Sequence, residues 1–186
     1  MNLSHHIEIP AEPMLWAKSW RADPVARALA DRHYNRNKVG AAQFVPPGRC
    51  AVFITPCERA FWVTSFPFAQ YVRHAWAGAW VCSAFRSEGA GVASDLIRSA
   101  IAATRWDLGE PPELGMITFV DRRKVRPIRV RGVDVWGWTY LKAGFAVAGE
   151  TKGGLLALQM RPEDMPLAQA PLLRETSDLP LFGANP

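Results

Sequence analysis

The chain has 186 residues, of which 49% are hydrophobic and 21% charged, and 22 Lys and Arg against 17 Asp and Glu give it a formal charge of +5. This composition excludes a disordered chain. The three cysteines are odd in number and irregularly spaced, which excludes a disulfide framework. No stretch reaches the roughly 18 apolar residues of a membrane span, and the N-terminus has no apolar run of the signal-peptide type. We therefore expect a cytoplasmic protein with no membrane partner.

The first predicted element is a helix. Asp23 and Pro24 supply an N-cap and a proline at the first helical position, and they predict a short helix that reaches His33. A loop rich in glycine, proline and basic residues follows, over residues 34–49. Runs of β-branched and aromatic residues then predict strands at 50–55, 61–66 and 80–85, the first two joined as an antiparallel hairpin.

The clearest helix is predicted for Gly91 to Trp106, because its apolar residues fill one half of the helical wheel. A buried strand is predicted at 115–120. We expect a second helix at Val133–Ala143, ended by Gly144 as a left-handed C-cap. A glycine turn at 152–154 then predicts a hairpin between strands at 145–151 and 155–160.

This order of elements predicts an α/β or α+β protein with a mixed sheet. At this length a single domain is expected, over residues 1–161 with its core in 50–160. The remaining residues, 162–186, contain five prolines and predict a tail without regular structure.

The junction from Arg86 to Gly91 lies between a predicted strand and the clearest helix. Its small residues Gly89, Ala90 and Gly91 would let a ligand approach the backbone, and the free amides of a helix start bind anions. A tight turn that only caps the helix is the alternative. The pattern Arg-x-x-Gly-x-Gly resembles the pyrophosphate-binding segment of the GCN5-related N-acetyltransferase (GNAT) superfamily.

A second pattern, Tyr140-x-x-x-Gly-Phe before a hairpin, resembles a late motif of the same superfamily. The resemblance implies a GNAT-like mixed, mostly antiparallel sheet flanked by helices on both faces. It also implies that Tyr140 protonates a leaving group and that acetyl-CoA or another acyl-CoA is the cofactor, held by Arg86, Gly89, Ala90 and Gly91. The alternative for Tyr140 is an amphipathic core tyrosine.

A dense run of basic residues follows Asp121. The run consists of Arg122, Arg123, Lys124, Arg126, Arg129 and Arg131. These six charges exceed the net charge of the whole chain, so the rest of the protein is close to neutral. Several arginines together bind phosphates, so the run predicts DNA or another polyanion as partner, with a solvated loop as the alternative. Tyr34, Arg36 and Lys38 repeat the pattern of basic residues beside an aromatic ring and are further candidates for nucleic-acid binding.

Within the superfamily, the chain resembles the Mom-like phage DNA-modification proteins. The resemblance is carried by His33-Tyr34-x-Arg36, Phe85-Arg86, Asp121 and Tyr140, and the long basic insert between the last two is a departure from it. It implies modification of adenine in DNA, which protects phage DNA from restriction in the host cytoplasm. Asp121 would orient the amine or accept its proton, Tyr140 would donate a proton to the leaving group, and His33 is a second candidate base.

Iron is implied by this resemblance alone, since no residue spacing in the chain is typical of a metal site. Two other functions stay open. An acyl-CoA-dependent N-acetyltransferase acting on a small amine or a protein would share the glycine turn and Tyr140 but would have no use for the arginine run. A non-catalytic nucleic-acid-binding protein on a degenerate GNAT fold would need only the cations. The sequence also leaves open whether the chain forms a homodimer.

Overall fold

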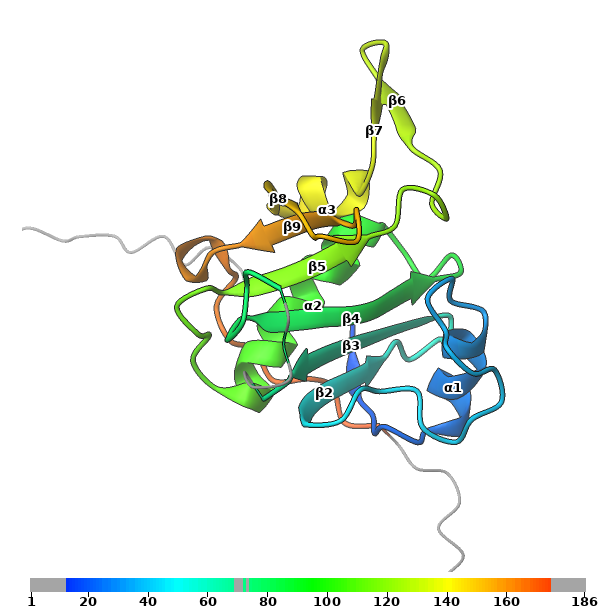
Figure 1. The fold of residues 1–186 in the computed structure, drawn as a ribbon. Helices are drawn as coiled ribbons and strands as arrows, with labels where there is room; N and C mark the ends of the chain where they lie inside the picture. Colours follow the sequence, from blue (N-terminus) through cyan, green and yellow to red (C-terminus); the bar gives the residue numbers. More distant parts are fainter. Residues whose placement is uncertain (1–12, 69–71, 73, 175–186) are drawn as a thin grey trace, which may run out of the picture.

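The computed structural model describes residues 13–68, 72 and 74–174 (Figure 1). Its first helix, α1 (Pro24–Asp31), begins as predicted, because the Asp23 side chain accepts a hydrogen bond from the backbone nitrogen of Val25 at 2.9 Å. The longest helix is α2 (Ala93–Leu108). The third, α3 (Trp138–Ala143), ends at Gly144 in the left-handed conformation, which confirms the predicted C-cap.

Seven strands form one sheet in the order β1-β2-β3-β4-β5-β9-β8. All neighbours are antiparallel except β4 and β5, which run parallel. The protein is therefore a mixed α/β protein with a mostly antiparallel sheet, as the sequence predicted at this level. The strands are β1 (Ala17–Lys18), β2 (Arg49–Ile54), β3 (Ala60–Phe66), β4 (Trp80–Ser87), β5 (Met116–Val120), β8 (Ala146–Glu150) and β9 (Leu156–Met160). In the described residues none of the three helices is long and apolar enough to cross a membrane.

Buried side chains of the sheet alternate between two main clusters, as expected for strands. Phe53 and Trp62 pack with Ile97 and other residues of α2. Val52 packs in the second cluster with Leu29 and other residues of α1. The two helices therefore pack against alternate residues of β2.

The sheet opens between its two parallel strands. Their pairing ends at Cys82 opposite Thr118, although β4 continues to Ser87 and β5 to Val120. At the same level β4 carries a bulge, because Cys82 and Ala84 pair with consecutive residues of β3 and leave Ser83 between them without a partner. Bulges of this kind bend a strand and are frequent next to active sites.

The predicted helix at Val133–Ala143 is wrong in its first half. Val133–Val135 form strand β7, which pairs with β6 (Ile128–Val130) in a separate two-stranded hairpin. Valine's branched side chain favours a strand, and Gly137, at φ +68°, ends the extended segment before α3 begins. The hairpin projects from the body of the molecule (Figure 1).

The described part of the predicted tail, residues 162–174, packs on the domain. It begins with a 3₁₀ turn at Pro162–Asp164, after which Met165 is buried in the main core. The backbone nitrogen of Leu172 donates to the carbonyl of Trp16 at 2.8 Å. The first twelve residues of the predicted domain and residues 175–186 of the predicted tail lie outside the described residues.

Candidate functional site

A cavity of about 280 Å³ opens where β4 and β5 part. Its walls come from the loop after α1, the second half of β4, the end of β5 and the segment from 125 to 140. Side chains with chemical functions in the lining include His33, Tyr34, Cys82, Arg126 and Tyr140. A concave site with aromatic walls and a few polar groups is the usual form of a ligand pocket, so this cavity is the candidate site.

Tyr140 lies in α3 and packs edge to face against Phe85 and Phe145. Its hydroxyl lies 3.5 Å from the Sγ of Cys82. Burial is the main reason that the pKa of Tyr140 is raised well above its usual value near 10, and Cys82 adds to the effect. Burial also raises the pKa of Cys82 to about 12. At neutral pH the phenol therefore keeps a proton that it can donate, and the thiol is not ionised.

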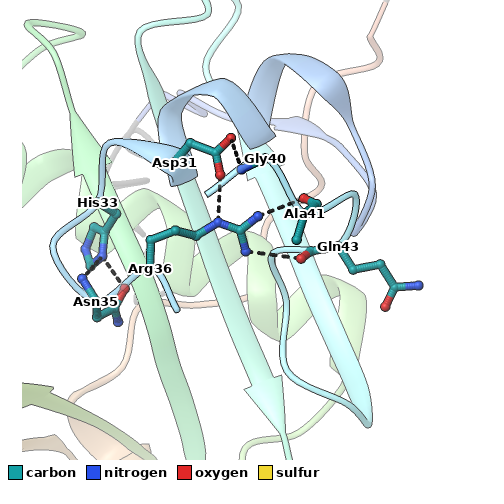
Figure 2. A network of polar contacts seen from close by, with 7 residues as sticks. All are labelled: Asp31, His33, Asn35, Arg36, Gly40, Ala41 and Gln43. Carbon is teal, nitrogen blue, oxygen red and sulfur yellow. Dashed lines mark hydrogen bonds and ion pairs between the residues drawn. The ribbon is translucent and has the colours of Figure 1, made fainter. Parts of the chain in front are cut away.

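The loop after α1 is held in place by a buried arginine (Figure 2). The side chain of Arg36 is only 9% exposed, and its Nε donates to Asp31 at 2.7 Å. Its two Nη atoms donate to the carbonyls of Ala41 and Gln43, at 2.8 and 3.1 Å. The hydrogen bond from Arg36 is also the main reason that the pKa of Asp31 is lowered. Arg36, predicted as a nucleic-acid contact, is thus used in the structure of the loop.

The same loop brings His33 and Tyr34 to the cavity, with ring centroids 4.6 Å apart. The hydroxyl of Tyr34 donates to the carbonyl of Phe119 at 3.4 Å, and burial raises the pKa of Tyr34. Burial lowers the pKa of His33, so its ring is neutral at pH 7. Nδ1 of His33 contacts the side chain of Asn35, and the ring also hydrogen-bonds the backbone of Phe85. These contacts fix the orientation of the ring.

Asp121 lines a second cavity, of about 340 Å³, that adjoins the first and shares Tyr34 and Cys82 with it. Arg123 donates to both carboxylate oxygens, at 2.8 and 3.0 Å, and this is the main reason that the pKa of Asp121 is lowered. Asp121 follows the last residue of β5, Val120, and Val120 lines the Tyr140 cavity whereas Asp121 does not. The structure therefore places Asp121 and Tyr140 in the walls of different, adjoining cavities.

Arg86 follows the cavity wall along β4 and binds within the protein. Its Nε donates to Glu88 at 2.7 Å, and its Nη1 donates to the carbonyl of Arg32 at 2.8 Å. Glu88 also receives a bidentate pair from Arg32, at 2.7 and 2.8 Å. Side-chain hydrogen bonds from Arg32 and Arg86 lower the pKa of Glu88 to about 2. Arg86 thus ties the end of β4 to the end of α1.

The glycine turn after Glu88 has the features of an open anion site. Gly89 and Gly91 have φ of +80° and +147°, which residues with a side chain rarely adopt, and a Cβ at Gly91 would meet no atom within 4 Å. Val92, the N-cap of α2, provides no side-chain hydrogen bond to the helix. The first amides of α2 are therefore not capped by their own N-cap side chain. The cavity with Tyr140 includes Phe85 and none of the described residues 86–91.

The six basic residues of the 122–131 run fall into two groups. Arg122 pairs with Glu150 at 2.5 Å, and Arg123 pairs with Asp121. Across the described residues the other cations of the run form no ion pair. These are Lys124, at the Asp121 cavity, Arg126, at the Tyr140 cavity, and Arg129 and Arg131, on the β6–β7 hairpin. Lys38, another predicted contact, is exposed on the loop after α1.

The sequence did not single out Cys82 or Asn35 as site residues, although both line the cavity. Asn35 ties the loop to the sheet, because its Nδ2 donates to the carbonyl of Ser83 at 3.0 Å. Cys82 is important only because β4 leaves β5 at that residue, and nothing local in the sequence indicates the point of separation.

Among the described residues no three His, Cys, Asp or Glu side chains come together as metal ligands. The residues described here therefore do not fit the iron that the family resemblance implies, and the chemistry proposed below involves the chain's own side chains.

No family model, curated protein or solved structure matches the chain. The resemblance to GNAT proteins accordingly depends on two short sequence motifs alone.

Proposed function

We propose that the chain is a transferase of GNAT-like fold that modifies a nucleobase amine, the N6 amine of adenine in DNA. The observation that carries the proposal is the cavity between β4 and β5, where a protonated tyrosine hydroxyl faces a space with aromatic walls and a cation, Arg126, at its border. Support for the fold comes from α1 and α2, which pack against alternate residues of β2, and from the bulge at Ser83 beside the opening.

Adenine N6 is a weak nucleophile, because its lone pair is delocalised into the ring, so an enzyme must position it and assist both proton transfers. Tyr34 and Trp138 offer rings at the cavity against which a base can stack. Tyr140 would donate its proton to the leaving group as the bond to the amine forms. Burial keeps the phenol protonated until that step.

The proton lost by the amine needs an acceptor. His33 is neutral at pH 7 and lines the cavity, and we propose it as the base, with its Nδ1 released from Asn35 when the substrate binds. Asp121 would have to release Arg123 before it could accept a proton. We therefore propose that Asp121 acts as a positioning residue that holds Arg123 and the start of the basic segment.

An acyl-CoA bound to this protein would supply the transferred group as a thioester. Gly89, Ala90 and Gly91, directly before α2, would hold its pyrophosphate through their backbone amides, and the amide of Ala90 would first release Ser87 Oγ, to which it donates at 3.3 Å. Glu88 is negatively charged beside this turn, but its charge is compensated by Arg32 and Arg86.

The test is to express the protein and its Tyr140→Phe variant in bacteria, digest total DNA to nucleosides and measure them by mass spectrometry. We expect a modified deoxyadenosine with the wild type and a loss of at least tenfold with Tyr140→Phe. Tyr34→Phe is the matched control and should keep the modification. It removes a hydroxyl from the same cavity, but that hydroxyl already donates to the carbonyl of Phe119. Only normal nucleosides in the presence of abundant soluble wild-type protein would refute the proposal.

The second candidate is an acyl-CoA-dependent N-acetyltransferase that acts on a small amine or a protein. The open glycine turn at the uncapped start of α2 favours it, since that feature needs no DNA. Saturable binding of acetyl-CoA in calorimetry, together with unmodified DNA and no DNA binding, would select this candidate.

A further inference from the structure

The β6–β7 hairpin is built to stand away from the sheet (Figure 1). Ile128 pairs with Val135, and Val130 pairs with Val133, so the loop between the strands is only Arg131-Gly132. Both loop residues have positive φ, +48° and +82°. Positive φ at both positions is the conformation in which a two-residue loop matches the twist of its strands.

Arg131 is an unusual residue for this turn. Asn, Asp or Gly is preferred at the first position, because a larger side chain disfavours the left-handed conformation. Among the described residues other than glycine, only Glu58 and Arg131 have positive φ. Arginine thus occupies a position at the tip of the hairpin where asparagine would fit the backbone conformation better. A strained position of this kind indicates that the side chain has a use.

The two faces of the hairpin differ in chemistry. Cross-strand partners share a face, so Ile128, Val130, Val133 and Val135 lie together, and Arg129 lies on the other face with its partner Asp134. The apolar face is open at Ile128 and Val133, which are 47% and 64% exposed, whereas Val130 and Val135 are half-buried. An isolated hairpin this small gains little stability of its own, so its exposed apolar face serves no folding purpose that the structure shows.

The charge of the hairpin and its base indicates the partner. In the described part of the chain Lys124, Arg126, Arg129 and Arg131 are free of ion pairs, and Asp134 is the only acidic residue among them. Cations on a narrow projection are typical of contacts to phosphates. The arginines that are paired, Arg122 and Arg123, lie at the base instead.

The dimensions of the hairpin suit a DNA groove. Two paired strands lie about 4.8 Å apart, and the major groove, about 12 Å wide and 8.5 Å deep, admits a two-stranded ribbon. Three residues per strand extend about 10 Å, which is enough to reach the floor of the groove. Ile128 and Val135, at the base of the ribbon, line the cavity that contains Tyr140.

We propose that the β6–β7 hairpin inserts into a groove of double-stranded DNA, with Arg129 and Arg131 on phosphates and the apolar face against the bases. This inference rests on the proposed function, because it assigns to the same cavity a base taken out of a duplex. Val133, next to the tip, would pack where the base pair has been opened, as apolar wedges do in other DNA complexes.

The test is fluorescence anisotropy of a fluorescein-labelled 21-base-pair DNA duplex, and of one of its strands alone, titrated with the full chain at several salt concentrations. The variant Arg129→Ala/Arg131→Asn removes both charges and provides asparagine, the residue that the turn prefers. Two lost phosphate contacts should lower the slope of log K against log salt by about 2 and weaken duplex binding about 50-fold at 0.1 M salt. Arg161→Ala, which removes an exposed cation directly after β9, is the control and should change neither.

Three results would overturn the inference. The first is that the double variant binds the duplex as the wild type does. The second is that the wild type binds the duplex and the single strand with equal affinity. The third is that the wild type is a dimer and that Val133→Ser makes it a monomer without changing DNA binding. The last result would show that the apolar face contacts a second copy. The Tm of Arg131→Asn should equal or exceed that of the wild type. This measurement distinguishes a loss of DNA contacts from misfolding of the variant.

The outcome is separable from that of the proposed function. If DNA is still modified in cells but the double variant binds duplex normally, only the hairpin assignment fails. If the double variant loses duplex binding in the expected way but wild-type cells contain normal nucleosides, the hairpin assignment holds and the transferase proposal fails.

Discussion

Replacing Arg36 by alanine should destabilise the fold through the loop after α1. The side chain donates two hydrogen bonds to backbone carbonyls, of Ala41 at 2.8 Å and of Gln43 at 3.1 Å. Hydrogen bonds to a charged group contribute about 1.5–3 kcal/mol when they are well buried. Because one of these two is exposed, we expect a loss of about 2 kcal/mol in the free energy of unfolding, and we add nothing for the ion pair with Asp31. In a chain of this length that loss lowers Tm by about 4–8 °C.

The measurement is urea unfolding followed by tryptophan fluorescence, for which the chain has eight tryptophans. Arg36→Lys is the first control, because it keeps the positive charge but cannot reach both carbonyls, and it should lose about half as much. Lys38→Ala is the second, since Lys38 is an exposed cation of the same loop. Its free energy of unfolding should stay within about 0.5 kcal/mol of the wild type.

The order of these three variants decides the matter. If Arg36→Ala unfolds at the same urea concentration as Lys38→Ala, Arg36 does not hold the loop, and the position of His33 and Tyr34 at the cavity depends on other contacts, such as that of Asn35 with Ser83. If Arg36→Lys is as stable as the wild type, charge alone matters and the hydrogen bonds to the carbonyls contribute nothing.

Three further predictions concern pH, glycine and thiols. The pKa of Glu88 is lowered from about 4.5 to about 2 by hydrogen bonds from two arginines, so its stabilisation is complete above pH 4.5 and is lost as the pH falls towards 2. Glu88→Gln should therefore reduce the fall in urea midpoint between pH 5 and pH 3, and an unchanged fall would contradict this. Gly115→Ala should lower the free energy of unfolding by more than about 3 kcal/mol, because its Cβ would lie 2.2 Å from a carbonyl oxygen. Gly154→Ala has open space and should lower it by about 1–2 kcal/mol, for its positive φ alone; urea unfolding measures both. Cys57 is exposed and its pKa is lowered by a hydroxyl neighbour, so it should react with a thiol reagent at pH 7.5, while Cys82, buried with a pKa of about 12, should react only after unfolding; equal rates would refute the burial of Cys82.

The helix ends and the last hairpin could be predicted from the sequence, because neighbouring residues alone determine them. Asp23 caps α1 through its own side chain, and Gly144 ends α3 in the left-handed conformation. The glycine turn at 152–154 joins β8 and β9 as predicted. Each of these depends on residues that are neighbours in the chain, so the sequence contains the whole signal.

The β6–β7 hairpin was missed although its signal was present. Arg131-Gly132 lies between valines that pair across the turn, but a basic run reads first as a loop. The valines that follow were predicted as the first part of a helix, but that helix, α3, begins only at Trp138. Valine favours a strand but also occurs in helices, and the left-handed glycine at 137 marks where the strand ends and the helix begins.

The residues of the site were harder to predict because their roles depend on tertiary contacts. Tyr140 was predicted and does line the cavity, whereas Asp121 was predicted beside it and lines the adjoining one. Tyr140 lies in α3 and Asp121 in the loop after β5, and their relative placement depends on how α3 packs, which has no local signal. The pairing of Arg122 with Glu150, 28 positions later, likewise has no local signal. Of the eight tryptophans, Trp16, Trp62 and Trp80 are buried, and nothing in their sequence neighbourhoods separates them from the other five.

Arginine has two opposite uses in this chain, and burial separates them. Arg36 is 9% exposed and fills its donors with protein acceptors, so its charge stabilises a loop and is not available to a ligand. Arg131 is exposed at a turn where its backbone conformation is unfavourable, so its charge is presented at a cost in stability. Since both lie in basic stretches near aromatic or β-branched residues, sequence alone treats them alike. Arg122 and Arg123 are paired with carboxylates, so fewer cations of the run are available to a ligand. The unpaired cations extend from the rim of the cavity to the tip of the hairpin. A polyanion that binds there would pass directly over the mouth of the site that contains Tyr140.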